Sequence, residues 1–296
     1  MKILITGLNG FLGKNISEYL DNQNFEILAI VRKKNKNYPK NFKIIKGDIQ
    51  NLSIANINKI KKFKPNTLLN LAWYGIPDFS YKNSLKNIEI HLNFLNKIVQ
   101  IESINKIIMT GSCWEYPDHI GRCKETLKNK PLSFFAWSKN SIYDYLKIIA
   151  KINDINLVWF RIFFMYGKYQ KNESLIPSII NSLKKSKKPN ILNPGHKNDF
   201  IHIDDVCRAI LIAINKKDIN GIFNIGSGIR TNVGKIYNKL LIELNISNKS
   251  YKLKKSNKIN QIANYANLNK ISSKLKWFPK INIEKGLKKM VNFYYG

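Results

Sequence analysis

Residues 1–13 combine a short apolar run with three closely spaced glycines. They read MKILITGLNGFLG, with glycines at positions 7, 10 and 13. This run predicts a strand, a tight turn and the start of a helix. The first glycine permits the turn, the second lets a pyrophosphate approach the backbone, and the third lets the helix pack closely on the sheet. We therefore predict a dinucleotide-binding fold, with the phosphates at the helix N-terminus.

The first half of the chain then alternates short apolar runs with longer amphipathic stretches, as in a parallel sheet with crossover helices. Strands are predicted at residues 2–7, 25–31, 42–48, 67–73, 106–112 and 155–167. Helices are predicted at 11–22, about 84–103 and about 136–152. The predicted fold class is therefore α/β, a Rossmann-like doubly wound parallel sheet.

The alternation changes after residue 167, which predicts a second, smaller α/β part. Its predicted elements are a helix at about 174–185, a strand entering a helix at 198–216, and a strand and turn at 221–228. We predict a NAD(P)-binding domain formed by residues 1–167 plus about 195–224. The substrate domain is predicted from about 168–194 and 225–296.

The formal net charge of +31 raises the question of a nucleic-acid or membrane partner. Only five of the 50 basic residues are Arg, and the chain is rich in Lys, Asn and Ile, whose codons are A/T-rich. The lysines form no Arg-rich stripe with interleaved aromatic residues. Compositional drift explains the charge, so neither partner is expected. A general positive field still favours an anionic substrate.

Three further features bear on the compartment. The longest apolar run, at 157–166, contains Arg161 and is too short to span a membrane. No signal peptide is expected, because the first residues run directly into a predicted strand. The three cysteines, an odd number without metal-ligand spacing, favour a reduced cytoplasmic compartment and predict no metal site.

The end of the second predicted strand bears on which dinucleotide is bound. An acidic residue there would hold a ribose 2′-hydroxyl, whereas a basic residue suits a 2′-phosphate. Val31 stands at the usual acidic position, and Arg32 and Lys33 follow it. This favours NADP(H). A basic triplet carries less information in a lysine-rich chain, so NAD(H) stays open.

Two later motifs add to the predicted cofactor site. GDI at 47–49 places Asp48 near an adenine amino group, and NLAW at 70–73 ends the fourth strand at the carboxyl edge, where open parallel sheets bind ligands. The predicted cofactor-binding residues are Gly7, Asn9, Gly10, Phe11, Leu12, Gly13, Arg32, Lys33, Asp48, Ile49, Leu71 and Ala72.

The order of motifs resembles the extended short-chain dehydrogenase/reductase family, the NAD(P)-dependent nucleotide-sugar epimerases, dehydratases and reductases. The resemblance covers essentially the whole chain. It is carried by TGLNGFLG, GDI, NLA, Asn87, TGSCWEY, SKNS, RIFFMYG, NDFIHIDDV, NIGSG and LKWFPKINIEKGLKK.

The resemblance also implies a catalytic set. In this family a Ser or Thr, a Tyr and a Lys act together: the Lys and the nicotinamide ribose lower the tyrosine pKa, and the tyrosine exchanges a proton with the substrate oxygen. Ser112 matches the hydroxyl position and Lys139 the lysine, which also contacts the cofactor. Asn87 matches an asparagine that helps arrange the site. The tyrosine position is occupied by Phe135.

Phe135 leaves the source of the proton open. Tyr143 and Lys147 repeat the i, i+4 spacing, but they lie two helical turns further along, where such a pair is more typical of a surface or an interface. Other candidate proton donors are Cys113, Glu115, Tyr116 and Tyr74. An unperturbed thiol has a pKa of roughly 8.5. Cys113 stands where the dehydratases of the family carry an acidic residue, which disfavours their mechanism.

Motif details are most similar to the 4-keto sugar-nucleotide reductases. The function expected is NADPH-dependent reduction of a 4-keto (deoxy) sugar on a nucleoside diphosphate, in activated-sugar biosynthesis for surface polysaccharide. A homodimer through the helices at 84–103 and 136–152 is implied by the resemblance. The expected substrate-binding residues are Trp73, Tyr74, Trp114, Phe164, Leu175, Pro177, Lys197, Asn198 and His202.

The nucleotide end departs from the family pattern. Asn198, preceded by Lys197, stands where many members have an Arg that grips the pyrophosphate, and Ser174 replaces another Arg. Lysine cannot reproduce a bidentate guanidinium contact.

The alternatives to the expected reductase are an NAD-dependent nucleotide-sugar epimerase, a non-catalytic protein that binds the nucleotide sugar or dinucleotide, and a Tyr-to-Phe form that has lost its activity.

Overall fold

The computed structural model describes residues 1–34, 38–118, 120–247 and 263–295, and it divides into two compact units. The first unit comprises residues 1–117, 127–161 and 207–223. The second comprises 118–126, 162–206 and 224–296, within the described ranges. No helix among the described residues is long and apolar enough to cross a membrane.

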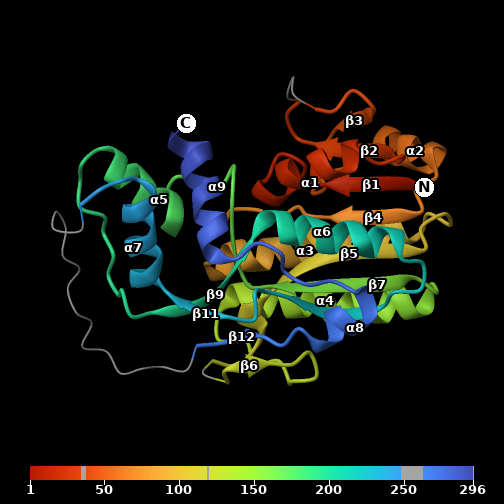
Figure 1. Ribbon diagram of the computed structural model, residues 1–296. Coiled ribbons are helices and arrows are strands. Elements are labelled where there is room, and N and C mark those ends of the chain that lie inside the picture. The colour runs from red at the N-terminus through yellow and green to blue at the C-terminus, as the bar shows by residue number, and fades with distance from the viewer. Residues whose placement is uncertain (35–37, 119, 248–262, 296) are drawn as a thin grey trace. The chain divides into compact units, whose positions relative to one another are not determined.

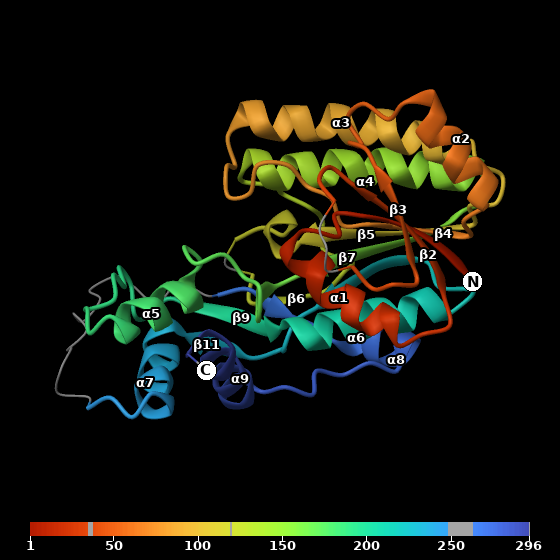
Figure 2. The ribbon, with the colours of Figure 1, turned by 90° about the horizontal axis from the view of Figure 1, so that it is seen from above.

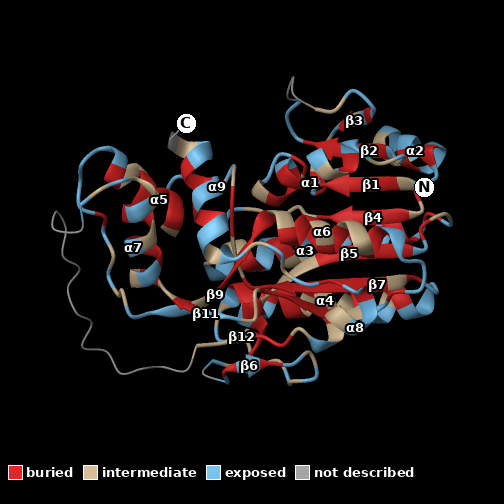
Figure 3. Cartoon of the chain, viewed as in Figure 1, coloured by how far each residue is buried: buried red, intermediate tan, exposed pale blue. Residues whose placement is uncertain are grey.

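The first unit is built around a seven-stranded sheet in the order β10-β7-β5-β4-β1-β2-β3 (Figure 1). The strands are β1 (Lys2–Thr6), β2 (Glu26–Val31), β3 (Phe42–Lys46), β4 (Thr67–Asn70), β5 (Lys106–Ser112), β7 (Asn156–Ile162) and β10 (Gly221–Ile225). The pairings of β1 with β2 and β4, of β2 with β3 and of β4 with β5 are parallel. The inner strands are largely buried, as Figure 3 shows, because helices cover both faces, whereas the edge strand β3 exposes Lys43 and Lys46.

Helices lie on both faces of this sheet (Figure 2). They are α1 (Phe11–Asp21), α2 (Ile54–Phe63), α3 (Tyr81–Val99), α4 (Phe134–Ile152) and α6 (Ile203–Asn215), of which residues 207–215 belong to this unit. α3 and α4 pack side by side on one face, and α1 and α6 cover the other. The core on the α3–α4 face includes Leu68, Phe94, Ile107 and Trp159.

The strand order reverses direction between β1 and β4. From β1 the chain builds outward to β2 and β3, then returns to β4 and continues to β5 and β7 on the other side. In open parallel sheets, ligands bind beyond the carboxyl ends of the strands at such a reversal. Because β1 ends at Thr6 and β4 at Asn70, the segments that follow these two residues form the expected binding edge.

The second unit contains two small sheets, β11-β9-β8 and β12-β6, and several helices. Its elements are β6 (Arg122–Cys123), β8 (Phe164–Tyr166), α5 (Leu175–Lys184), β9 (Lys197–His202), β11 (Arg230–Asn232), α7 (Val233–Glu243), β12 (Tyr265–Ala266), α8 (Asn269–Leu275) and α9 (Ile283–Tyr295). α5, α7 and α9 enclose a separate apolar core around Ile180, Leu240 and Leu287. Buried Asp199 ties this unit together by accepting hydrogen bonds from the backbone of Ser227, Gly228 and Ala266.

The predicted α/β class with a parallel, Rossmann-like sheet is confirmed. Element boundaries differ in places. α4 begins at Phe134 rather than near 136, because the Ser133 side chain accepts a hydrogen bond from the backbone N–H of Ala136 and caps the helix there. The apolar run at 155–167 is two strands, β7 and β8, interrupted at Phe163. α2, capped by Ser53, was not anticipated from the sequence.

Candidate functional site

The glycine turn after β1 adopts a backbone that only glycine permits. Gly7 has φ +74°, and a Cβ there would lie 2.5 Å from the backbone carbon of Leu71. A Cβ on Gly13 would lie 2.1 Å from the Gly7 carbonyl oxygen. Gly10 caps α1 with an extended backbone and without a side-chain hydrogen bond. The first turn of α1 therefore presents its backbone N–H groups toward an incoming ligand, the arrangement that suits phosphate.

The loop of the glycine turn is fastened to the end of β2. The Asn9 amide donates to the Lys33 carbonyl oxygen at 3.0 Å, and the Tyr38 hydroxyl donates to Asn9 Oδ1 at 2.6 Å. Sequence reasoning did not anticipate Tyr38. These contacts bring the predicted phosphate site and the predicted selectivity segment at 32–33 to one edge of the sheet.

Arg32 is held against an aromatic ring at this edge. Its guanidinium carbon lies 5.1 Å from the centre of the Tyr74 ring, and the Tyr74 hydroxyl donates to Asp48 Oδ1. Burial and the carboxylate of Asp48 both raise the pKa of Tyr74. The predicted cofactor residues Arg32 and Asp48 and the predicted substrate residue Tyr74 are thus one cluster, at the carboxyl ends of β2, β3 and β4.

The segment after β4 packs back onto β1. The backbone N–H of Leu71 donates to the Thr6 carbonyl oxygen at 3.3 Å, and that of Ala72 donates to the Thr6 hydroxyl oxygen. The Thr6 hydroxyl in turn donates to Asn70 Oδ1 at 2.5 Å. The predicted residues Leu71 and Ala72 therefore lie directly beneath the glycine turn. Ile49 and Leu12 are buried beside this edge and contribute packing.

Lys139 lies in the second turn of α4 and is almost fully buried, with 4% of its surface exposed. Its ammonium donates to the Thr110 carbonyl oxygen at 2.8 Å and lies 3.6 Å from the centre of the Trp73 ring. Burial lowers the pKa of Lys139 from 10.5 to about 7, against an opposing influence of the Glu115 carboxylate. A buried amine with this pKa is charged and neutral in comparable amounts near neutral pH.

Phe135 stands one turn before Lys139, inside a cluster of aromatic rings. Its ring centre lies 5.5 Å from that of Trp73, 4.9 Å from that of Phe79 and 5.7 Å from that of Trp114. We call these four residues the aromatic cluster. Trp73 and Trp114 meet Phe135 edge-on, a favoured geometry for aromatic pairs. The cluster joins two predicted substrate residues to the position where the resemblance places a tyrosine, but Phe135 has no proton to donate.

Ser112 ends β5, and the capping box of a short 3₁₀ helix, η1 (Cys113–Glu115), fixes its backbone. The Glu115 carboxylate accepts from the Ser112 N–H at 2.7 Å, and the Ser112 hydroxyl oxygen accepts from the Trp114 N–H at 3.2 Å. Cys113 begins this 3₁₀ turn and is buried. The predicted hydroxyl of Ser112 is thus set at the carboxyl end of β5, on the same strand end that binds Lys139.

Glu115 is itself held by groups far away in the sequence. Its carboxylate accepts from Arg161 Nε at 2.8 Å and from Trp159 Nε1 at 3.2 Å, and all three side chains are buried. Burial raises the pKa of Glu115, while the Arg161 charge acts in the opposite direction. A Cβ on Gly111 would collide with both Trp159 and Glu115. Sequence reasoning missed this network because its members are separated by up to 46 residues.

Asn87, predicted to help arrange the site, binds the segment that follows β4. Its side-chain oxygen accepts from the Tyr74 N–H at 2.9 Å, and its amide donates to the Tyr74 carbonyl oxygen at 3.2 Å. One turn later, the buried His91 ring contacts the carbonyl oxygens of Asn87 and Ala72, at 2.8 and 3.1 Å. α3 thereby holds the loop that carries Trp73 and Tyr74. His91 was not singled out from the sequence.

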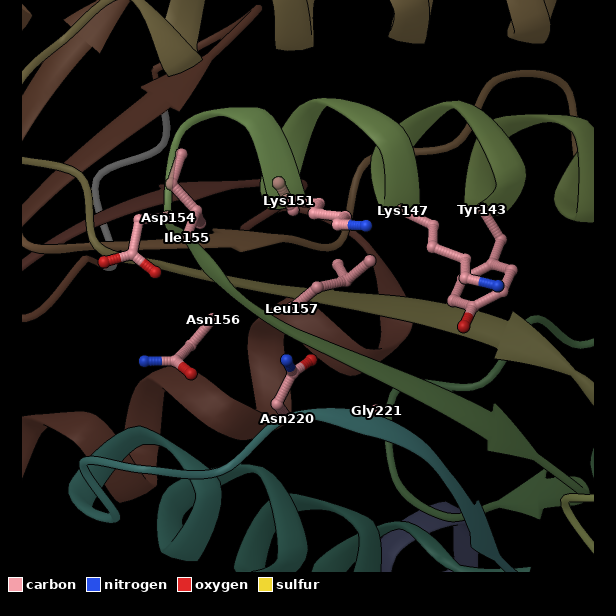
Figure 4. A pocket seen from close by; sticks show the side chains of 10 residues that line it. Tyr143, Lys147, Lys151, Asp154, Ile155, Asn156, Leu157, Asn220 and Gly221 are labelled. Carbon is pink, nitrogen blue, oxygen red and sulfur yellow. The ribbon is translucent and has the colours of Figure 1, made fainter.

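The alternative pair Tyr143–Lys147 lies elsewhere on α4. Tyr143 stacks against Trp159 with ring centres 5.3 Å apart. Both residues line a cavity of about 550 Å³ at the far end of the helix, near Asp154 and Asn220 (Figure 4). Lys139 instead binds the end of β5 beside Ser112, and Phe135 lies in the aromatic cluster.

The remaining predicted substrate residues belong to the second unit. Phe164 on β8 pairs with Phe200 on β9, and their ring centres are 6.0 Å apart. Lys197 and Asn198 begin β9, and His202 ends it, with its ring nitrogen accepting from the Asp204 N–H at 3.2 Å. Burial lowers the pKa of His202. Leu175 and Pro177 occupy the first turn of α5.

A glycine turn on a reversed parallel sheet, a capped serine and a buried lysine one turn after an aromatic position define the class. The fold is that of a Rossmann-like α/β protein. A family model described as the NAD dependent epimerase/dehydratase family matches residues 3–226. The chain therefore belongs to that family, and the resemblance drawn from its motifs is confirmed.

Individual relatives and structures agree with this membership. The chain is 27% identical to a putative UDP-glucose 4-epimerase of Methanocaldococcus jannaschii, over 98% of this chain and 97% of the relative. It is 25% identical to the dTDP-6-deoxy-L-talose 4-dehydrogenase (NAD(+)) of Aggregatibacter actinomycetemcomitans, over 77% and 85%. A mutant UDP-glucuronic acid 4-epimerase from Bacillus cereus, in complex with UDP-4-deoxy-4-fluoro-glucuronic acid and NAD, has the same fold. Its TM-score is 0.86 at 22% identity, covering 100% of this chain and 99% of the other.

Proposed function

We infer that this chain is an NADPH-dependent reductase of a 4-keto (deoxy) sugar carried on a nucleoside diphosphate, acting in activated-sugar biosynthesis for surface polysaccharide. The observation that carries the proposal is the buried ammonium of Lys139, bound to β5 at the strand end that presents Ser112. Family membership supplies the reaction class. The relative named as a dTDP-6-deoxy-L-talose 4-dehydrogenase supports redox chemistry at the 4-position of a deoxy sugar.

The residues at the edge of the first unit fit a nicotinamide dinucleotide. Gly7 and Gly13 leave no room for side chains, and the open first turn of α1 offers N–H groups for a pyrophosphate. Such a cofactor, when bound, supplies the hydride. Lys139 would contact its ribose, and the Ser112 hydroxyl would hold the substrate carbonyl oxygen by a hydrogen bond. The NAD named with the Bacillus cereus enzyme supports a dinucleotide at this edge.

Selectivity for NADPH over NADH is assigned to Arg32. The residue before it is Val31, so no carboxylate stands there to bind a ribose 2′-hydroxyl. Tyr74 supports the guanidinium of Arg32 by a cation–π contact, and Asp48 fixes the Tyr74 hydroxyl. Held in this way, Arg32 would be available as a partner for a ribose 2′-phosphate, which suits an enzyme that consumes NADPH.

We assign the two units different tasks within this function. Unit one binds the dinucleotide, with Ser112 and Lys139 at the reacting end. Unit two, through Lys197, Asn198, His202 and the start of α5, would bind the nucleotide of the substrate. UDP-sugar ligands named for a solved relative support a nucleoside-diphosphate sugar as the substrate class. The reaction is placed in the cytoplasm, where reduced dinucleotide is available.

A homodimer through α3 and α4 forms part of the proposal. Six apolar residues on these helices remain exposed to solvent although the helices pack against each other. They are Tyr81, Leu85, Phe134, Trp137, Ile148 and Ile152, with exposed fractions between 37% and 76%. Apolar surface gathered in this way is typical of an interaction face.

An NAD-dependent nucleotide-sugar epimerase is the second candidate, and the relative named as a putative UDP-glucose 4-epimerase favours it. An epimerase keeps its dinucleotide and shows no net change in it, whereas a reductase consumes one NADPH per sugar. A third candidate, a protein that binds its ligands without turnover, is favoured by Phe135 alone.

Titration with NADPH and NADH tests the cofactor assignment. We expect NADPH to bind more tightly than NADH. The Arg32→Gln variant should lower the affinity for NADPH by about 10- to 100-fold, because a charge-assisted hydrogen bond is lost. NADH affinity should change little. Arg122→Gln, at an exposed arginine, is the matched control and should leave both affinities unchanged. Binding of neither dinucleotide would exclude the oxidoreductase assignment.

A further inference from the structure

The Lys139 ammonium has the surroundings of a group that releases a proton readily. No carboxylate among the described residues forms an ion pair with it, and the side chain is 4% exposed. Its hydrogen bond goes to a neutral acceptor, the Thr110 carbonyl oxygen, and the Trp73 ring covers another side. A buried charge without an ion partner is disfavoured relative to its neutral form.

Three other titratable groups nearby, Tyr74, Glu115 and His91, are engaged. The Tyr74 hydroxyl is bound to Asp48, and burial raises the Tyr74 pKa. Glu115 accepts hydrogen bonds from Ser112, Trp159 and Arg161. If its carboxylate moved away, the buried Arg161 guanidinium would lose its ion pair. His91 is enclosed between two carbonyl oxygens on α3.

The ammonium is also near the place where the substrate oxygen would be held. Thr110 and Ser112 lie two residues apart on β5, which corresponds to about 7 Å along the strand. The Phe135 ring centre is 5.8 Å from the Lys139 Nζ. A single water between Lys139, the Ser112 hydroxyl and the substrate oxygen would have three polar partners, within the two to four that ordered waters usually have.

We propose that Lys139 is itself the proton source of the reduction, delivering its proton through one water to the substrate oxygen in place of the phenol that Phe135 lacks. This rests on the proposed function. The carbonyl carbon would accept the hydride that NADPH supplies when bound, and the C=O π pair would move to oxygen. That oxygen takes a proton from the water, which takes one from the ammonium. The products are the alcohol, NADP⁺ and a neutral amine that regains its proton from solvent.

The pH dependence follows from the groups that face Lys139. They are Glu115 on η1, which favours the ammonium, and His91 on α3, whose own pKa burial lowers to about 4, so that it is neutral near pH 7. The acid form of Lys139 is required, and its pKa is about 7. The rate of reduction should therefore be highest below pH 7 and fall as the pH rises through that value.

The test follows NADPH oxidation with a 4-keto-6-deoxy sugar nucleotide in wild-type protein and three variants. Lys139→Arg keeps the positive charge, but a guanidinium stays protonated, so we expect kcat to fall by about 10²–10⁴ while NADPH still binds. Lys147→Met, which removes a lysine two turns later on the same helix, should keep the wild-type rate. Phe135→Tyr should raise the rate and replace the wild-type pH profile, because a phenol then delivers the proton.

The outcomes separate this inference from the function on which it rests. A wild-type rate that falls above pH 7, together with loss in Lys139→Arg, supports Lys139 as the donor. Overturning results are an undiminished rate in Lys139→Arg, an equal loss in Lys147→Met, or turnover that occurs only in Phe135→Tyr; the reductase assignment survives each of these. Absence of NADPH binding in all four proteins overturns both. If Lys139→Arg does not fold, the wild-type and Phe135→Tyr pH profiles decide alone.

Discussion

At the scale of single residues, the position of Ser112 depends on a buried ion pair. The Glu115 carboxylate holds the Ser112 N–H and is itself neutralised by Arg161. Both charges are almost completely buried. The free-energy cost of removing two charges from water can exceed their mutual attraction. We therefore expect the pair to fix local geometry rather than to add net stability. Through the hydrogen bond to the Ser112 N–H, the pair fixes the Ser112 backbone at the end of β5.

Removing one partner of this pair should therefore be severe. Glu115→Gln leaves the Arg161 charge buried without compensation, and we expect the free energy of unfolding to fall by about 3–5 kcal/mol. The double variant Glu115→Gln/Arg161→Met should recover part of this loss. Glu284→Gln, in the more exposed Lys239–Glu284 pair, should cost no more than about 1 kcal/mol. Urea denaturation measures all three, and equal losses for the two single variants would contradict this view.

Lys139 should also impose a pH dependence on stability. Its pKa is about 7 in the folded protein and 10.5 ordinarily, so between these values the unfolded chain binds more protons. The free energy of unfolding contributed by this residue therefore rises with pH across that window. Below pH 7 the buried charge should make the wild-type protein less stable than the Lys139→Met variant. This gap, the difference between their free energies of unfolding, should close toward pH 10.5. A gap that does not vary with pH would show that Lys139 is not buried as a cation.

At the scale of elements, the glycine turn between β1 and α1 is where we propose that the cofactor binds. Gly7 and Gly13 are required by the fold, since Cβ atoms there would lie 2.5 Å and 2.1 Å from backbone atoms. At Gly10 the nearest atom to a Cβ is the Gly7 carbonyl oxygen at 3.2 Å, so the fold leaves more room. The three glycines thus have separable roles.

This separation can be measured. Gly7→Ala should destabilise the protein by at least about 1–3 kcal/mol, because φ +74° is strained for alanine and its methyl group meets the segment after β4. Gly10→Ala should change stability by less than about 1 kcal/mol but weaken NADPH binding, since the methyl group occupies the approach of the pyrophosphate. Thermal unfolding and dinucleotide titration of both variants provide the readouts. If the Gly10→Ala variant binds NADPH as tightly as the wild-type protein, the pyrophosphate does not bind at Gly10.

Sequence reasoning identified the elements that local signals specify. The strand–glycine–helix run and the alternating apolar segments predicted the first unit, because periodicity and turn chemistry are local. It did not reveal the Glu115–Arg161 pair, the role of His91 or the stacking of Arg32 on Tyr74. Each of these joins residues that only the folded sheet brings together. The start of α4 was misplaced by two residues, although Ser133 supplies a visible cap.

At the scale of the whole molecule, the exposed apolar residues of α3 and α4 predict association. Leu85→Lys combined with Ile148→Lys should convert a dimer into a monomer, because two charges would be buried at the interface. Ile242→Lys, an equally apolar and exposed position on α7, is the control and should leave the assembly unchanged. Sedimentation equilibrium distinguishes the two states. A wild-type monomer at all concentrations would contradict the proposed interface.

The charge of +31 also acts on the whole molecule. A strongly positive field raises the local concentration of anionic ligands, and salt screens it over about 8 Å at physiological ionic strength. Both proposed ligands, NADPH and a nucleoside-diphosphate sugar, are anions. The charge therefore favours their encounter with the protein without specifying either one.

The most direct test of the account is NADPH consumption during turnover of a 4-keto-6-deoxy sugar nucleotide by wild type and Phe135→Tyr. We predict one NADPH oxidised per sugar reduced in both proteins, with a rate about 10²–10⁴ higher in Phe135→Tyr, since the phenol restores a positioned general acid. Sugar epimerisation without net NADPH oxidation, or no turnover by either protein, would contradict the assignment of this chain as a reductase.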